Sequence, residues 1–258
     1  MEHDLDKGQH FMVDKILLQR IIEVAEITEK DYLLEVGSGE GALTEYLVKT
    51  PAKKLICVEQ DARLPSPFEK YSSFSGETKY VQDNILKIIP SLNFSKVVAN
   101  IPYHVSEPLF REFTFSRPKK IVCVVGKKFS EVLLGKTILG GVLQSIYDIE
   151  EVQEIPPSAF SPPPDVLSAL VVLTLKDKTL LSKSDKIIAK FYKFNKSKVK
   201  NFVINVTQEM FTKKEIKEKL AFLHGALLDK ELYSLTNEEF MKIKEYIEFL
   251  CSEFVHVR

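Results

Sequence analysis

Cysteine is scarce in this sequence, and its spacing excludes the usual cysteine-based architectures. Cys57, Cys123 and Cys251 form no C-x-x-C pair and are odd in number, which argues against a disulfide framework or a zinc site. Cys57 and Cys123 fall within apolar, strand-like runs, so we expect both to be small buried hydrophobic residues. The five histidines show no metal-ligand spacing either. We therefore expect no metal ion.

Long apolar runs and excess charge are also absent. No run approaches the roughly 18 apolar residues that a membrane-spanning helix needs, so we expect no membrane partner. The N-terminus is acidic and lacks the apolar stretch of a signal peptide, which makes a cytoplasmic location the expectation. Lys and Arg number 36, as do Asp and Glu, and the formal net charge is zero. A nucleic-acid partner would therefore need a local basic patch.

The remaining composition is that of a globular protein, with 45 % hydrophobic and 28 % charged residues. Short β-rich runs alternate with helical stretches, which predicts an α/β fold: a mostly parallel sheet with helices on both faces. We expect strands at residues 32–36, 54–59, 79–82, 96–99 and 121–125. Two further β-like runs, 149–155 and 167–175, flank a Pro-rich loop and predict a hairpin-like pair at the sheet edge. Lys-rich helical patterns then predict a small all-α C-terminal domain at 177–258, after a first domain at 1–176.

A glycine-rich turn follows the first predicted strand. Residues 35–41 read E-V-G-S-G-E-G, an acidic-x-G-x-G-x-G pattern, not the G-x-G-x-x-G of dinucleotide-binding folds. Glycine permits positive φ and lets a ligand approach the backbone closely. The narrower turn suits the methionine and ribose part of S-adenosylmethionine, although a purely structural turn has the same pattern.

Carboxylates close the next two predicted strands. Glu59 ends the second strand, where a carboxylate can accept hydrogen bonds from both ribose hydroxyls of a nucleoside. Asp83 follows the third strand, where it can accept from the adenine amine. Either residue alone is more often a solvated charge at a strand end. Together with the glycine turn they favour a nucleoside site at the carboxyl edge of the sheet.

The fourth predicted strand runs directly into the sequence N-I-P-Y at residues 100–103. The side-chain oxygen of Asn100, with the carbonyl of the residue before or at Pro102, can accept both hydrogens of an aromatic amine. These bonds free the nitrogen lone pair for attack on a sulfonium methyl group. Pro102 stiffens the loop, and Tyr103 can stack on a flipped base. An Asn-x-Pro turn beside a core tyrosine is the alternative interpretation.

These motifs resemble the small-subunit ribosomal RNA adenine dimethyltransferases and the related erythromycin-resistance methylases. Residues 8–14, G-Q-H-F-M-V-D, are similar to a family element that folds over the cofactor. Residues 156–169, P-P-S-A-F-S-P-P-P-D-V-L-S-A, resemble a loop typical of the ribosome-modifying branch. The resemblance implies a Rossmann-like class I methyltransferase domain, S-adenosylmethionine as cofactor, and dimethylation of adenines in the pre-small ribosomal subunit. We also expect a monomer.

The resemblance also implies specific site residues. The cofactor contacts carried over to this sequence are His10, Met12, Gly37, Glu59, Asp83 and Asn100. Those carried over for the target adenine and its methylation are Asn100, Pro102, Tyr103 and Phe160, with Tyr103 and Phe160 sandwiching the base.

Three segments depart from the family pattern. The Gln, Glu and Arg that usually follow strand five are missing from residues 126–132, and residues 136–141 lack the usual Y-G-R-L-S-V element. Phe194 stands where an Arg is usual. A weakly active or inactive ribosome-assembly factor that keeps the fold is therefore the alternative hypothesis. A DNA adenine methylase fits residues 100–103 but not the Pro-rich loop, and an NAD-dependent oxidoreductase fits least.

Lysines gather near the start of one predicted C-terminal helix and form a candidate RNA-binding patch. They are Lys190, Lys193, Lys196, Lys198 and Lys200. A solvated helical face gives the same pattern, and their position in the family favours RNA.

Overall fold

The computed structural model describes residues 10–71, 74–223 and 225–256, and the chain divides into two compact units. Unit 1 comprises residues 1–131 and 147–175, and unit 2 comprises residues 132–146 and 176–258. This division differs from the expected boundary at residue 176, because the segment 132–146 groups with the C-terminal helices. Gly141 shows why: a Cβ at this position would meet the ring of Phe240 at 2.6 Å, so the segment packs directly against the last helix.

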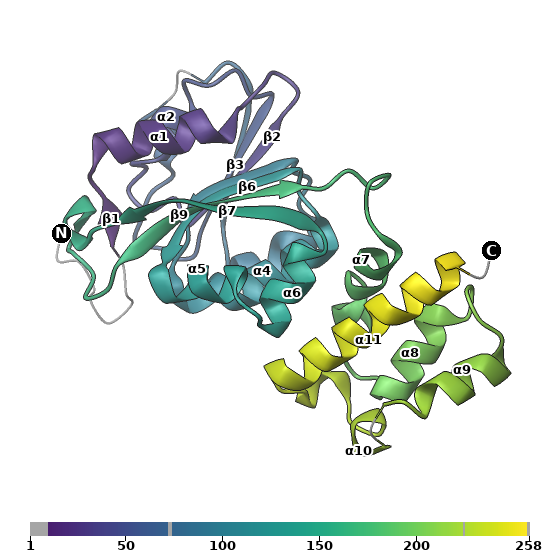
Figure 1. Ribbon diagram of the computed structural model, residues 1–258. Coiled ribbons are helices and arrows are strands. Elements are labelled where there is room, and N and C mark those ends of the chain that lie inside the picture. The colour runs from purple at the N-terminus through teal and green to yellow at the C-terminus, as the bar shows by residue number, and fades with distance from the viewer. Residues whose placement is uncertain (1–9, 72–73, 224, 257–258) are drawn as a thin grey trace. The chain divides into compact units, whose positions relative to one another are not determined.

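Unit 1 is built on a seven-stranded sheet in the order β4-β3-β2-β5-β6-β9-β7 (Figure 1). The first five strands in this order are parallel, β9 is antiparallel to β6, and β7 is antiparallel to β9. The predicted hairpin-like pair is therefore present, with β7 at the edge. In sheet order the strands are Glu77–Gln82, Lys54–Glu59, Tyr32–Val36, Lys96–Asn100, Lys120–Gly126, Ser168–Leu175 and Tyr147–Ile155.

Helices cover both faces of this sheet, and α1 (Lys15–Ala25) and α4 (Ser106–Ser116) lie on opposite sides of it (Figure 1). Asp14 caps α1 by accepting hydrogen bonds from two amides of its first turn. The predicted Rossmann-like α/β fold is confirmed. The other helices between strands are short: α2 (Thr44–Leu47), α3 (Ile85–Ile88) and α5 (Lys127–Leu134). The helix that follows the glycine turn, α2, is short and ends at Leu47 without reaching Pro51.

Unit 2 is helical. Its helices are α6 (Ile138–Gln144), α7 (Lys183–Ile188), α8 (Val199–Thr207), α9 (Lys213–Leu220), α10 (Gly225–Leu228) and α11 (Asn237–His256). Helix α7 ends at Ile188, and a 3₁₀ turn at Phe191–Phe194 follows it. The ring of Phe191 is buried in this unit at 4.9 Å from that of Phe240, which anchors the turn.

A second, two-stranded sheet joins distant parts of unit 1. Strand β1 (Phe11–Met12) pairs with β8 (Phe160–Ser161), with Met12 opposite Phe160. The amide of Val13 also donates to the carbonyl of Ala159 at 2.9 Å. These bonds fix the N-terminal segment against the Pro-rich loop. Gly8 and Gln9, the first two residues of the N-terminal motif, lie outside the described residues.

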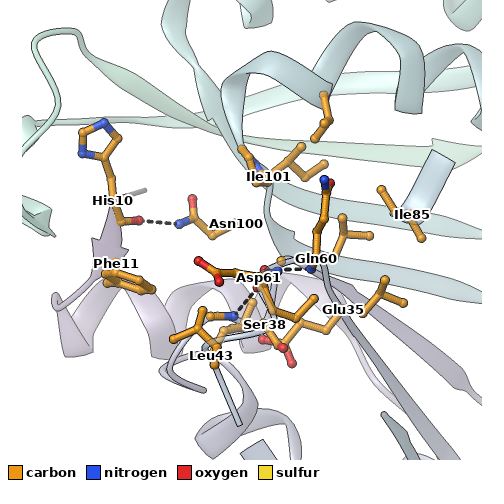
Figure 2. A pocket seen from close by; sticks show the side chains of 18 of the residues that line it. His10, Phe11, Glu35, Ser38, Leu43, Gln60, Asp61, Ile85, Asn100 and Ile101 are labelled. Atoms are coloured by element: carbon orange, nitrogen blue, oxygen red, sulfur yellow. Dashed lines mark hydrogen bonds between the residues drawn. The ribbon is translucent and has the colours of Figure 1, made fainter. Parts of the chain in front are cut away.

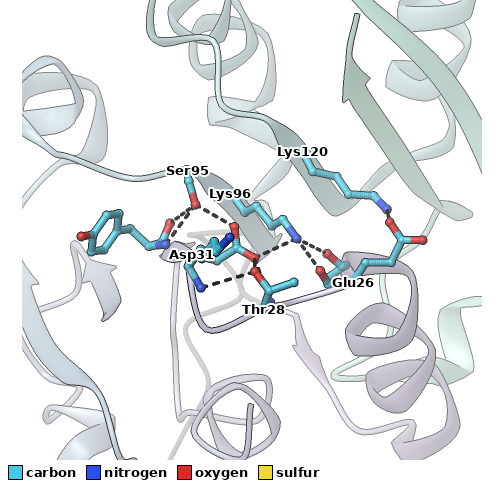
Figure 3. A network of polar contacts seen from close by, with 9 residues as sticks. Glu26, Thr28, Asp31, Ser95, Lys96 and Lys120 are labelled. Carbon is cyan, nitrogen blue, oxygen red and sulfur yellow. Dashed lines mark hydrogen bonds and ion pairs between the residues drawn. The ribbon is translucent and has the colours of Figure 1, made fainter. Parts of the chain in front are cut away.

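A polar network ties together the amino ends of the central strands (Figure 3). Nζ of Lys96 lies 3.0 Å from Oδ2 of Asp31, and both side chains are nearly buried. Lys96 also donates to the carbonyls of Ala25 and Glu26 at the end of α1. It thereby satisfies carbonyls that have no partner within the helix. Lys120 pairs with the carboxylate of Glu26 on the same edge.

The described residues contain neither a membrane-spanning helix nor a metal cluster. None of the helices described is both long and apolar enough to cross a bilayer. Within the same residues, no group of three or more His, Cys, Asp or Glu side chains could hold a metal ion. Cys57 and Cys123 are both fully buried in strands, as predicted.

Candidate cofactor and base site

A cavity of about 640 Å³ opens at the carboxyl edge of the parallel strands (Figure 2). It lies where β2, β3, β4 and β5 end, which is where ligands bind in open α/β sheets. Every site residue that was predicted from the sequence lines this one cavity. They are His10, Met12, Gly37, Glu59, Asp83, Asn100, Pro102, Tyr103 and Phe160.

The glycine turn forms one wall of the cavity and leaves no room for side chains. Gly37 and Gly39 have φ angles of +70° and +54°, which other residues rarely adopt. A Cβ on Gly39 would meet the ring of Phe11 at 2.9 Å, and one on Gly37 would meet the ring of Pro102 at 3.3 Å. The turn is therefore pressed between the N-terminal segment and the N-I-P-Y loop, so its backbone borders the cavity directly.

Ser38 supplies an unused polar atom in this wall. Its Oγ is buried, and among the described residues it has no hydrogen-bond partner. A buried hydroxyl without a partner costs free energy, so its place in a cavity wall indicates a polar ligand group. The cavity wall thus offers the backbone of the glycine turn, the hydroxyl of Ser38 and nearby carboxylates. These groups match the amino-acid and ribose parts of S-adenosylmethionine. The residues present thus fit this cofactor.

The carboxylate of Glu59 connects the end of β3 to the glycine turn. Its Oε2 accepts from the amide of Gly39 at 2.9 Å, and its Oε1 accepts from the amides of Gln60 and Asp61 at 2.8 and 2.9 Å. A carboxylate has about four acceptor positions, so roughly one remains for a ligand hydroxyl. Holding both hydroxyls of a ribose would require one backbone bond to be exchanged.

Glu35 is a buried carboxyl group beneath the turn, and no role was predicted for it from the sequence. It is 1 % exposed, and its Oε2 accepts from the hydroxyl of Thr44 at 2.6 Å and from the thiol of Cys57 at 3.1 Å. The pKa of Glu35 is raised from 4.5 to about 7. Burial is the main cause and the nearby charge of Glu59 adds to it, while the hydrogen bonds from Thr44 and Cys57 lower the pKa. Its position as the acidic residue of the motif is the signal that could have identified it.

Asn100 projects from the end of β5 toward the N-terminal segment (Figure 2). Its side-chain nitrogen donates to the backbone carbonyl of His10 at 3.2 Å. This bond uses the amide donor and directs Oδ1, the acceptor, elsewhere in the cavity. The ring of His10 is itself fixed, with Nδ1 lying 2.9 Å from the carbonyl oxygen of Pro162.

The two aromatic residues of the site differ in exposure. Tyr103 is partly exposed, whereas Phe160 is only 4 % exposed and belongs to the hydrophobic core beneath α1. Burial raises the pKa of Tyr103, so its hydroxyl stays protonated near neutral pH. Asp83, by contrast, is an exposed residue at the cavity rim whose Oδ1 accepts from the amide of Asn84.

Relatives with known names match most of the chain. A probable ribosomal RNA small subunit methyltransferase A of Methanococcus maripaludis (strain C6) is 37 % identical over 193 residues, covering 72 % of this chain and 73 % of that protein. A ribosomal RNA small subunit methyltransferase A of Prochlorococcus marinus (strain MIT 9515) is 31 % identical over 258 residues, covering 92 % of each.

Solved structures share the fold. A dimethyladenosine transferase from Plasmodium falciparum aligns with a TM-score of 0.65 at 24 % identity, covering 93 % of this chain and 98 % of that one. A 23S rRNA methyltransferase, ErmE, aligns with a TM-score of 0.60 at 20 % identity, covering 92 % and 99 %. The family model described as ribosomal RNA adenine dimethylase matches residues 4–248. The chain therefore belongs to the ribosomal RNA adenine dimethylase family.

Proposed function

We propose that this protein transfers methyl groups from S-adenosylmethionine to N6 of adenines in small-subunit ribosomal RNA, giving dimethyladenosine. The observation that carries the proposal is the meeting of the N-I-P-Y loop with the glycine turn, Glu59 and Asp83 in one cavity. An amine-binding loop and a nucleoside-binding edge that share a cavity are what methyl transfer to adenine requires. The relatives' names support ribosomal RNA as the substrate.

The cofactor would be held by the glycine turn, Ser38, Glu59 and Asp83. When bound, it supplies an electrophilic methyl group on sulfur. The backbone at Gly37 and Gly39 permits close approach, and the Ser38 hydroxyl gains the polar partner that it lacks within the described residues. His10 and Met12, held by the β1–β8 pair, would close the cavity over the cofactor and exclude water.

The target amine would be held by Asn100 and one backbone carbonyl of the loop. Because the Asn100 nitrogen already donates to His10, its Oδ1 is available to accept an amine hydrogen. The carbonyl of Pro102 already accepts from the amide of Val105 and the hydroxyl of Ser106, at 3.1 and 3.3 Å. We therefore assign the second acceptor to the carbonyl of Ile101. Pro102 keeps this loop rigid and packs over Gly37.

The base would stack mainly on Tyr103, which offers the more exposed ring. Phe160, at 4 % exposure, would contribute the opposite wall of the base pocket. Each transfer would form one N–C bond while the S–C bond to the methyl group breaks, would leave S-adenosylhomocysteine, and would release one proton from the amine. The second transfer therefore needs room for a monomethylated nitrogen. Stacking tolerates the added methyl group because stacking involves the faces of the adenine ring, whereas the methyl group lies at the ring edge.

The RNA partner would also contact the lysine-rich segment of unit 2. Lys190, Lys193, Lys196, Lys198 and Lys200 are all exposed there. Lys198 lies 3.4 Å from Asp229, an exposed pair that water and salt screen. This local concentration of positive charge compensates for the net charge of zero in the chain.

The test uses purified protein, labelled S-adenosylmethionine, and small ribosomal subunits from a strain that lacks the gene. Digestion to nucleosides should yield labelled dimethyladenosine. Label in another nucleoside, or none while calorimetry shows that the cofactor binds, would contradict the proposal.

A second candidate is an assembly factor with little or no activity. At the start of α5, Lys127 and Ser130 both bond to Glu151 of β7, in the segment where the family pattern has Gln, Glu and Arg. The Asn100→Ala variant separates the two functions in cells. If it reproduces the full deletion phenotype, transfer is the essential activity and the assembly-factor hypothesis is wrong.

A further inference from the structure

The hydroxyl of Tyr103 lies 2.7 Å from Oγ of Ser168, which is 65 residues further along the chain. Ser168 is fully buried and is the first residue of β9. It lies opposite Gly126 of β6 on one side and Ile155 of β7 on the other. Because two neighbouring strands fix its backbone, Ser168 is a rigid anchor for the tip of the Tyr103 ring.

Two more contacts define where this ring lies. A Cβ on Gly126 would be 3.7–3.8 Å from three atoms of the ring, so the ring lies against the end of β6 at ordinary contact distance. The ring of His10 lies near it, with centroids 6.1 Å apart and planes inclined by 31°. A hydrogen bond thus holds the hydroxyl of Tyr103, while Gly126 at the end of β6 and the ring of His10 border the Tyr103 ring.

We propose that Ser168 is a positioning residue of the methyl transfer, because its hydroxyl fixes the orientation of the ring on which the target adenine stacks. This inference rests on the proposed function. Ser168 itself is buried and is not among the residues that line the cavity, so it acts through Tyr103. A small displacement of the stacked base moves the amine out of line with the methyl group, and transfer depends steeply on that alignment.

A purely structural role makes a different prediction. If the hydrogen bond only stabilised the fold, its loss would lower the free energy of unfolding and leave transfer by the folded protein unchanged. A positioning bond affects the reaction itself, while the cofactor site at the glycine turn keeps its affinity. Loss of the bond therefore distinguishes the two roles: only a positioning role predicts slower methyl transfer to RNA with an unchanged affinity for the cofactor.

The experiment compares Ser168→Ala, Tyr103→Phe and the double variant, with unmodified small subunits as substrate. Each single change removes the same hydrogen bond and should lower kcat/KM for RNA about tenfold. The double variant should lose no more than either single one, because both residues act through one interaction. The Kd for S-adenosylmethionine, measured by calorimetry, should change less than about twofold.

A matched control is Thr114→Val, which removes another buried hydroxyl of unit 1, one bonded to the carbonyl of Arg111 in α4. It should leave RNA kinetics at the wild-type value. Base stacking is followed separately with a short RNA that carries 2-aminopurine at the target position. Wild-type protein should quench its fluorescence, and Ser168→Ala should quench it less at saturation.

Three results would overturn the inference: wild-type kinetics in Ser168→Ala, losses that add in the double variant, or equal quenching by wild type and Ser168→Ala. Wild-type protein that produces no dimethyladenosine contradicts the proposed function instead, and the quenching comparison then still decides the role of Ser168. Wild-type protein that neither transfers methyl groups nor quenches the probe overturns both, since no stacked base exists to be positioned.

Discussion

The amide of Gly39 donates a 2.9 Å hydrogen bond to Oε2 of Glu59 and so joins the glycine turn to the end of β3. The same carboxylate accepts two amides that follow β3. The buried carboxylate of Glu59 therefore fixes the geometry of the turn. In the proposed function it also accepts a hydrogen bond from a ribose hydroxyl. If the proposed function is right, the structure of the turn and the binding of the cofactor depend on the same two oxygen atoms.

Glu59→Gln should weaken S-adenosylmethionine binding roughly ten- to hundredfold, because hydrogen bonds to a charged acceptor contribute about 1.5–3 kcal/mol each. The amide group of Gln also places a donor against one of the backbone amides. Isothermal titration calorimetry measures the Kd. The matched control is Glu77→Gln at the start of β4, where the exposed carboxylate pairs with Lys54. Equal affinities in the two variants would show that Glu59 does not hold the cofactor.

Asn100→Ala should reduce kcat by roughly 10²- to 10³-fold, the usual effect of removing one preorganised hydrogen-bonding group from a transition state. The variant lacks the acceptor that we assign to the amine, and the β1 segment loses the bond from Asn100 to His10. Labelled methyl incorporation under single-turnover conditions measures the effect.

The Asn100 variant needs a control for the missing His10 bond. His10→Ala keeps its backbone carbonyl, and therefore the bond from Asn100, while it removes the ring. It should raise the Kd for the cofactor more than it lowers kcat. If His10→Ala reduces kcat as much as Asn100→Ala does, closure of the cavity, not amine binding, limits transfer.

The stability of the protein should depend on pH through Glu35. Its folded-state pKa of about 7 exceeds the unfolded value of 4.5, so the folded protein binds this proton more tightly than the unfolded chain. Its contribution to stability is fully present below pH 4.5 and is lost as the pH rises to about 7. At about 1.4 kcal/mol per pKa unit, the loss amounts to roughly 3 kcal/mol.

Urea unfolding of wild type and Glu35→Gln at several pH values from about 4.5 to about 8 measures this contribution. Gln cannot titrate, so the wild-type free energy of unfolding should fall relative to that of the variant as the pH rises. Other groups titrate in both proteins and cancel in the difference. If the difference in free energy of unfolding between the two proteins stays constant over this pH range, the pKa of Glu35 is not raised in the folded state.

The strand ends could be predicted from the sequence because β-rich runs and the polar residues after them carry a local signal. Glu59 ends a predicted strand, Asp83 and Asn100 directly follow one, and the carboxyl ends of parallel strands meet at one edge. The β1–β8 pair carries no such signal, since two-residue strands have no periodicity and their partners lie far apart in the chain. Phe11 also lines the cavity but was not among the predicted site residues, whereas its neighbours His10 and Met12 were carried over from the family resemblance.

Two other features could not be predicted from the sequence, because they too depend on contacts between residues far apart in the chain. The grouping of residues 132–146 with unit 2 depends on the close approach of Gly141 and Phe240, which are distant in the chain. The bond between Tyr103 and Ser168 depends on the β6–β9 register, which apolar runs do not fix. Both are long-range contacts between residues of ordinary type.

Lys96→Met should destabilise unit 1 by about 3–5 kcal/mol, because it leaves the carboxylate of Asp31 buried without its cation. Both side chains are nearly inaccessible, and Lys96 also caps the end of α1 (Figure 3). Chemical denaturation at neutral pH gives the change. The control Lys49→Met breaks an exposed ion pair with Glu45 and should cost less than about 1 kcal/mol.

A double variant tests the origin of this destabilisation. Adding Asp31→Asn to Lys96→Met removes the unpaired charge, so the double variant should be more stable than the sum of the two single effects indicates. Strict additivity would mean that the two side chains do not interact, and that Lys96 acts only on the carbonyls at the end of α1.

The lysine-rich segment should contribute to RNA binding through its charge. Replacing Lys193, Lys196 and Lys200 by Gln should weaken binding and make the slope of log K against log salt less negative, by about 0.7–0.9 for each phosphate that the variant no longer neutralises. Filter binding of small-subunit RNA at salt concentrations from about 50 to about 300 mM measures the slope. The control replaces Lys49, Lys242 and Lys244, which removes the same charge from lysines that each pair with a glutamate four residues away in the chain: Glu45, Glu238 and Glu248. Equal slopes in the two triple variants would mean that RNA affinity depends on overall charge. A less negative slope in the Lys193, Lys196 and Lys200 variant alone would place phosphate contacts on the lysine-rich segment.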